Sequence, residues 1–141
     1  MNAYTAISNL LFKFANSFDT KDWEGLESTL MDTIECDYQD LRKETGHYTK
    51  AEYVNTRKKA LSTLKTQHLF SNLEFYLDKK HPDCKLSAVI YRRNKADKAF
   101  DSHVMYHFEL NESARKEWKI QKIKQVVLWN EGDASIHAGL K

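Results

Sequence analysis

The sequence has few residues that interrupt or cross-link regular structure. Four glycines and one proline in 141 residues leave little material for linkers, so we expect one domain spanning residues 1–141. The two cysteines, Cys36 and Cys84, match no metal-binding or redox spacing, and we expect reduced, buried and inert thiols. No apolar run approaches the roughly 18 residues of a membrane helix. No secretion signal precedes the first helix, so we expect a cytoplasmic protein.

Neither sign of charge dominates. The chain has 22 basic and 20 acidic residues and a net charge of +2, which argues against a nucleic-acid-binding surface. Basic residues concentrate between Lys79 and Lys98, where we interpret them as solvated turns and an exposed strand face. We therefore expect no nucleic-acid or membrane partner. The aromatic content of 12% favours a packed core with an apolar cavity.

The first part of the chain has helical periodicity. Apolar residues at 3, 4, 7, 10, 11, 14 and 18 predict a helix over residues 3–18 with one core-facing stripe. A shorter helix is expected over residues 21–30, with Asp19 or Thr20 as its cap. Residues 33–40 alternate like a strand, which places Tyr38 on an inward face.

A third helix follows a polar connection. Thr49 and Glu52 have the spacing of a capping box, which predicts a helix from residue 50 to about residue 64. After it the pattern changes to four strand-like segments joined by short polar turns, over residues 67–77, 85–93, 99–110 and 118–129. Helices followed by a meander predict an α+β fold, in which a curved antiparallel sheet wraps around the N-terminal helices and encloses a pocket.

The third of these strands has one polar and one apolar face. Asp101, His103, Met105 and His107 alternate with an apolar set. We expect the polar face to line the pocket and the apolar face to join subunits, giving a dimer or trimer through the convex sheet. His103 and His107 would lie about 13 Å apart along a strand, too far for one metal ion. We expect no metal, and a site made of Asp19, His68 and His103 is the less favoured alternative.

Four short motifs resemble scytalone dehydratase and its SnoaL-like relatives in the nuclear-transport-factor-2-like superfamily. They are Phe-Asp-Thr-Lys-Asp-Trp at 18–23, Asp-Tyr at 37–38, Thr-Gln-His at 66–68 and Trp-Lys-Ile at 118–120. The resemblance covers about residues 4–130. It implies a cone-shaped α+β fold and the removal of water from a small ring compound without metal or cofactor.

The resemblance also implies site residues. The family's aspartate falls on Asp19, one tyrosine on Tyr38 and one histidine on His68. Its second tyrosine falls on Phe18, a serine falls on His103, and the second histidine is absent near residues 92–94. Of the family's long C-terminal lid only residues 131–141 remain.

Each candidate residue has two interpretations. His68 shares a predicted strand face with Phe70 and Asn72. It is interpreted either as a general acid or base, or as a hydrogen-bonded histidine in the core. Asp19 orients a histidine, acts as a base or caps a helix. Tyr38 holds a substrate oxygen or packs in the core.

We therefore expect a cofactor-independent lyase (a dehydratase) or isomerase acting on a small, mostly apolar cyclic compound. Its expected catalytic residues are Asp19, His68 and Tyr38. The expected substrate contacts are His103, Phe18, Met105, Phe70 and Asn72. The alternatives are a non-catalytic small-molecule-binding or oligomeric partner protein of the same fold, and an interaction protein whose pocket is filled by side chains.

Overall fold

The computed structural model describes residues 2–42 and 45–137. Its elements confirm the predicted α+β class. In chain order they are α1 Ala3–Asp19, α2 Trp23–Ser28, β1 Leu30–Asp37, α3 Gln39–Arg42, β2 Thr45–Thr49, α4 Lys50–Ala60, β3 Leu64–Tyr76, β4 Asp83–Asn94, β5 Phe100–Glu112, β6 Trp118–Gly132 and the 3-10 helix η1 Ala134–Ile136.

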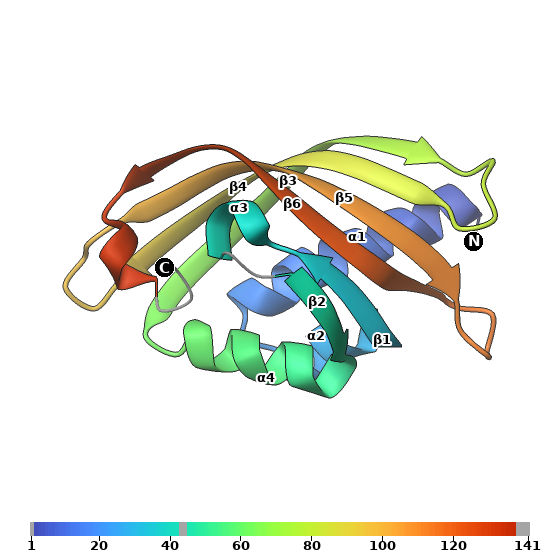
Figure 1. The fold of residues 1–141 in the computed structure, drawn as a ribbon, viewed down its shortest axis with the longest axis horizontal. Coiled ribbons are helices and arrows are strands. Elements are labelled where there is room, and N and C mark those ends of the chain that lie inside the picture. The colour runs from blue at the N-terminus through green and yellow to red at the C-terminus, as the bar shows by residue number, and fades with distance from the viewer. Residues whose placement is uncertain (1, 43–44, 138–141) are drawn as a thin grey trace.

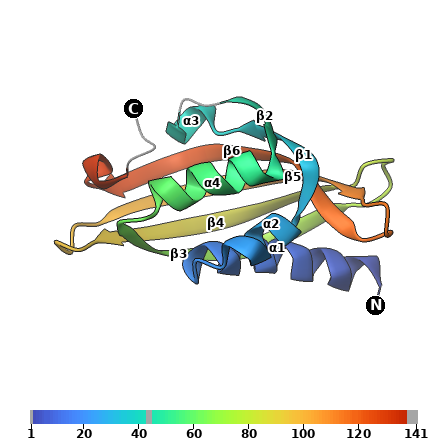
Figure 2. The same cartoon turned by 90° about the horizontal axis from the view of Figure 1, so that it is seen from below.

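The six strands form one curved, unclosed sheet in the order β2-β1-β6-β5-β4-β3. β1 pairs with β6 in parallel, and the other neighbouring strands are antiparallel. The sheet arches over α1 and α4, which lie together on its concave side (Figures 1 and 2). The prediction of a curved sheet wrapped around the N-terminal helices is therefore confirmed. The short strand β2 lies in the segment that was expected to be a polar connection.

Helix α1 buries most of its predicted apolar stripe, although Ala3 and Tyr4 are exposed, and it ends at a functional candidate. Asn2 caps its first turn by accepting a hydrogen bond from the Thr5 N–H at 2.9 Å. The expectation that Asp19 or Thr20 caps the second helix is wrong. That cap is Asp22, whose side chain accepts from the Gly25 N–H at 2.9 Å. The carboxylate of Asp19 thus remains available for contacts elsewhere.

Helix α4 begins with the predicted capping box. Thr49 Oγ1 accepts from the Glu52 N–H at 3.1 Å, and Glu52 Oε1 accepts from the Thr49 N–H at 3.0 Å. The helix ends at Ala60, earlier than expected, because the chain enters β3 at Leu64. The sheet strand therefore starts early enough to place His68 well inside it.

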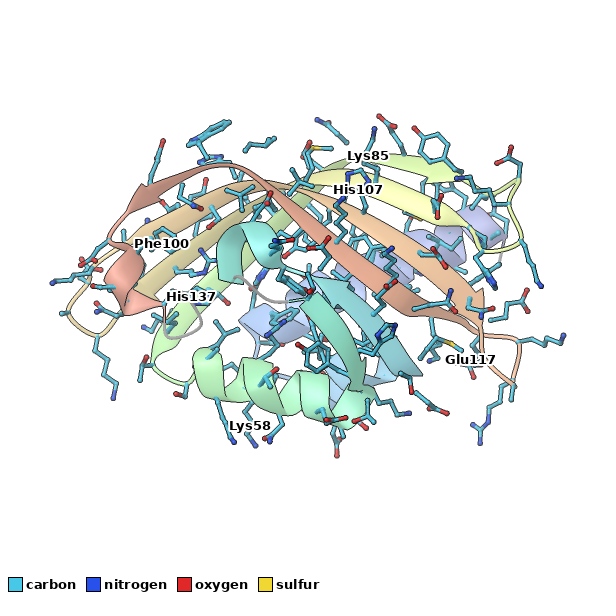
Figure 3. All side chains as sticks on the ribbon, viewed as in Figure 1. Lys58, Lys85, Phe100, His107, Glu117 and His137 are labelled. Carbon is cyan, nitrogen blue, oxygen red and sulfur yellow. The ribbon has the colours of Figure 1, made fainter. Side chains whose placement is uncertain are left out.

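Strand β5 turns its apolar face inward. The buried set on this face is Phe100, Val104, Tyr106, Phe108 and Leu110. The expectations that His103 and Met105 point into the pocket and that the apolar face of this strand joins subunits are therefore wrong, because a central strand gains most by burying its apolar side against the helices. Figure 3 shows His107 and the neighbouring Lys85 on the side of the sheet away from α4.

A β-bulge in β3 reverses the alternation of its side chains. It lies between Ser71 and Glu74, and Asn72 within it has a φ of 54°. His68 points inward before the bulge, and Phe75 packs against the core after it. The expectation that Asn72 shares the face of His68 is wrong, because the extra residue shifts the register and leaves Asn72 exposed.

Both cysteines are buried, as expected. Cys36 and Cys84 are each 1% exposed and form no disulfide. Burial raises the pKa of the Cys84 thiol to about 12, so this thiol stays protonated at neutral pH. None of the helices in the described part of the chain has the length and apolar character needed to cross a membrane.

We expect Asn72→Val to lower the free energy of unfolding by about 1–2 kcal/mol, because a β-branched residue is strained at positive φ. Asn72→Gly should change it by less than about 0.5 kcal/mol. Ser71→Val, at an exposed neighbouring site, is the matched control. Urea denaturation measures all three, and an equal loss in Asn72→Val and Ser71→Val would contradict strain at the bulge.

Candidate functional site

One carboxylate joins the end of α1 to β3. Asp19 Oδ1 lies 2.7 Å from His68 Nδ1, and Asp19 Oδ2 accepts from the His68 backbone N–H at 2.7 Å. The Thr66 hydroxyl donates to Asp19 Oδ1 at 3.0 Å. The three bonds fix both the backbone and the ring of His68 relative to α1.

This contact exists because β3 is an edge strand of the sheet. His68 pairs with Ile90 of β4 on one side, while on the other side its N–H has no further strand to bond. Asp19 accepts that N–H. Leaving such a buried group unsatisfied would cost about 1–3 kcal/mol, so the contact serves the fold as well as the site.

Aromatic rings hold the His68 imidazole from two directions. The Phe18 ring stacks on it, with centroids 5.0 Å apart and planes at 26°. The Phe70 ring meets it edge-on at 6.5 Å and 77°. The His68 side chain is 7% exposed. Phe18 and Phe70 thus lie beside the candidate base, as expected, and Phe18 also lines the adjoining cavity.

The hydrogen bond with Asp19 assigns roles to the two ring nitrogens of His68. An ionised carboxylate can accept hydrogen bonds but cannot donate them. The proton between Asp19 Oδ1 and His68 Nδ1 is therefore assigned to Nδ1 in the neutral ring. Nε2 is then the nitrogen that can take up and release a proton. Asp19 also stabilises the imidazolium that forms when it does.

A small cavity of about 30 Å³ adjoins His68. This is well below the roughly 150 Å³ of a cavity that holds benzene, so the cavity as it stands admits a small group and not a whole ring. Most of the residues that line it carry a polar side-chain group. The lining residues are Phe18, Tyr38, Arg57, Leu61, Thr66, His68, Ile90, Arg92, Tyr106 and Gln125.

Tyr38 belongs to a group of buried phenols at this cavity. Its hydroxyl forms a hydrogen bond with the Tyr53 hydroxyl at 2.7 Å. Burial raises the pKa of Tyr38, Tyr53 and Tyr106 above that of an ordinary phenol, so these groups stay protonated at neutral pH. They can donate hydrogen bonds but do not serve as bases. Tyr38 and His68 thus line the same cavity, and Asp19 contacts His68 through Nδ1. The catalytic role of these three residues stays a prediction.

Two arginines line this cavity, and they come from different elements. Arg92, and not Arg93, lines it from β4; Arg93 pairs with Asp101 at 2.7 Å away from the cavity. Arg57 was missed by the sequence analysis. A signal was present, because Arg57 follows the buried Tyr53 and Val54 at helical spacing and so lies on the inward stripe of α4.

Buried Gln125 was also missed. It follows Ile123 on β6, and both side chains are buried on the same face. A glutamine inside an otherwise apolar alternation was the available signal, since buried amides need hydrogen-bond partners.

Three predicted substrate contacts lie away from the cavity. His103 stacks on Trp129 with ring centroids 4.1 Å apart, and Met105 Sδ accepts from the Ser87 hydroxyl at 3.2 Å, both on the outer face of the sheet. Asn72 is exposed at the bulge. Within residues 2–42 and 45–137, no group of three or more His, Cys, Asp and Glu side chains is arranged to hold a metal ion.

A family model described as SnoaL-like domain matches residues 1–124. A comparison with curated proteins gave no match.

Solved structures show the same fold at low sequence identity. The protein Kfla4162 from Kribbella flavida is 15% identical with a TM-score of 0.87, over 94% of this chain and 95% of that one. A proposed scytalone dehydratase from Novosphingobium aromaticivorans is 14% identical with a TM-score of 0.80, over 92% and 87%. The hexachlorocyclohexane dehydrochlorinase LinA-type3 from Novosphingobium barchaimii is 15% identical with a TM-score of 0.79, over 96% and 92%. At such identities the likeness shows the fold alone.

Proposed function

Since this chain belongs to the SnoaL-like domain family, of the nuclear-transport-factor-2-like superfamily, we propose that it is a cofactor-independent lyase or isomerase in which His68 transfers a proton. The observation that carries the proposal is the Asp19–His68 pair at 2.7 Å beside a cavity. A histidine oriented by a carboxylate is a recurring arrangement for general acid–base catalysis.

In the proposed reaction, His68 Nε2 takes a proton from a substrate carbon. Asp19 stabilises the resulting imidazolium through Nδ1–H, and the protonated Tyr38 hydroxyl donates to the substrate oxygen. For a dehydration, the imidazolium returns the proton to the departing hydroxyl, the C–O bond breaks and water leaves. For an isomerisation, the proton returns to another carbon, and His68 ends neutral in both cases.

The relatives in the comparison support a lyase. One relative is described as a proposed scytalone dehydratase and another as a dehydrochlorinase. Both names denote the loss of a small molecule from a substrate. A cavity of roughly 150 Å³ is needed to hold a ring the size of benzene, whereas this cavity offers about 30 Å³. Entry of a ring would therefore require side chains such as Arg57 on α4 and Leu61 at its C-terminal cap to move.

The small cavity also favours a second candidate, a protein of the same fold that binds a small molecule without changing it. Phe18 stacks on His68 in the place where the family resemblance expects a tyrosine hydroxyl. Arg92 lines the cavity near the position of the family's second histidine. Recovery of every bound compound unchanged would distinguish this candidate from the enzyme.

We expect His68→Gln to lower turnover by about 100- to 10,000-fold in a screen of hydroxy-ketones and epoxides, because the variant loses the proton acceptor. Asp19→Asn should also lower turnover, since the amide cannot stabilise the imidazolium. His47→Gln is the matched control, because it removes an imidazole that is 73% exposed and away from the cavity, and it should leave turnover unchanged. Product formation is followed by chromatography, and equal turnover of the wild type and His68→Gln would remove His68 from the mechanism.

The proposal includes a homo-oligomer, a dimer or trimer, through the convex sheet face. The outward row that supports it crosses four strands and consists of Leu69, Val89, His103 and Trp129. Leu69 is 47% exposed and Trp129 is 52% exposed, so this row offers apolar surface to a second copy.

Light scattering of the wild type should give at least twice the monomer mass, and Trp129→Lys should shift the protein toward the monomer, because a charge in this row opposes its burial. Phe12→Lys, on the exposed side of α1, is the control and should keep the wild-type mass. A monomeric wild type in dilute solution would contradict the oligomer.

A further inference from the structure

A buried amide at the cavity has one end without a hydrogen-bond partner. Gln125 of β6 is 3% exposed and lines the cavity. Its Nε2 donates to the Tyr106 hydroxyl at 3.0 Å, whereas its Oε1 is buried and accepts no hydrogen bond within residues 2–42 and 45–137. A buried amide oxygen without a donor destabilises the fold. Gln125 is therefore better suited to contact a bound molecule than to stabilise the protein.

The hydroxyl of Tyr106 has a hydrogen left to donate. Tyr106 of β5 and Gln125 of β6 are direct partners in the sheet register, and both side chains are buried on the inner face. The Tyr106 oxygen accepts from Gln125, so that bond does not use the hydrogen of the hydroxyl. Tyr106 also lines the cavity. Burial raises the pKa of its phenol, which keeps this hydrogen at neutral pH.

Together the two side chains offer one donor and one acceptor. This holds for either orientation of the amide, and the two orientations are assigned rather than observed. With the amide turned over, Tyr106 donates to the amide oxygen, and the amide NH₂ group and the Tyr106 oxygen are then left over. In both cases the matching ligand atom accepts one hydrogen bond and donates another. A hydroxyl oxygen does so, whereas a carbonyl oxygen only accepts.

We propose that Tyr106 and Gln125 bind a hydroxyl group of the substrate and determine the specificity of the site. Tyr106 donates to the substrate oxygen, and Gln125 Oε1 accepts the hydrogen of the same hydroxyl. The substrate class is an alcohol, as opposed to a compound whose polar groups only accept hydrogen bonds. This inference rests on the proton-transfer function proposed above and adds the residues that recognise its substrate.

The size and position of the cavity support this assignment. Its volume of about 30 Å³ exceeds the roughly 10–15 Å³ that a single water needs, so a hydroxyl group fits. The Phe70 ring packs against both His68 and Tyr106, with centroids 6.5 and 5.4 Å apart. His68 lines the same cavity. A substrate anchored through its hydroxyl would thus be held beside the proposed base, which is how positioning accelerates proton transfer.

The test compares hydroxyacetone with 2-butanone by NMR titration. In 2-butanone a methyl group replaces the hydroxyl, so the two ketones are similar in size and differ in hydrogen bonding. We expect the wild type to bind hydroxyacetone at least about tenfold more tightly, because 2-butanone leaves the polar pair without partners in a closed site.

Gln125→Leu should bring the affinities for the two ketones within about twofold of each other, because the acceptor is lost. The double variant Tyr106→Phe/Gln125→Leu removes both polar groups and should show no preference either. It leaves no unpaired hydroxyl, so it serves if Gln125→Leu does not fold. Gln121→Leu on the same strand is the matched control and should retain the wild-type preference. The amide of Gln121 is hydrogen-bonded at both ends, to Asn111 and Glu109, and does not line the cavity.

A wild type that binds neither ketone, or binds both equally, would overturn the hydroxyl site. Equal weakening of both ketones by Gln125→Leu would also overturn it, because a purely structural role gives that result. The proton-transfer function is tested separately, since His68→Gln should keep the preference for hydroxyacetone while it loses turnover. A wild type that prefers hydroxyacetone but turns over no substrate would support the hydroxyl site and remove the enzyme.

Discussion

The Asp19 carboxylate is the group on which the arrangement of the site depends. It is the last residue of α1, and its two oxygens accept from the backbone and ring of His68 and from Thr66. The helix thereby takes the place of a neighbouring strand at the edge of the sheet. A single residue thus secures the helix–sheet packing and sets which nitrogen of His68 exchanges a proton.

Burial and charge give the groups around the cavity two different roles. The phenols of Tyr38 and Tyr106, which line the cavity, stay protonated because burial disfavours their ionised forms, and so does the phenol of Tyr53, which is hydrogen-bonded to Tyr38. The arginines Arg57 and Arg92 remain charged, and both lower the pKa of Tyr106 against the larger effect of burial. Such a cavity contains hydrogen-bond donors and positive charge, and His68 is the group in it suited to accept a proton. This division is the physical basis for the proposed acid–base site.

The order of the longer elements could be predicted because each has a strong local signal, whereas the short elements α3 and β2 were missed. The stripe of α1, the capping box at Thr49 and the alternation of the later strands all depend on nearby residues. Asp19 and His68 were found through their motifs. Alternation alone does not say which face of a strand is buried. For this reason His103 was predicted to face the pocket, whereas it lies on the outer face of the sheet. The bulge at Asn72 adds one residue with no sequence signal beyond the tolerance of asparagine for positive φ. Arg57 was missed because a charged residue on a buried stripe needs tertiary partners that the sequence does not display.

The most direct test of the account is the protonation pattern of the His68 ring, measured by ¹⁵N NMR of protein labelled at histidine. With Asp19 at 2.7 Å from Nδ1, the neutral ring should carry its proton on Nδ1 and leave Nε2 unprotonated. A neutral ring protonated at Nε2 would contradict the account, because the nitrogen assigned to accept the substrate proton would already hold one.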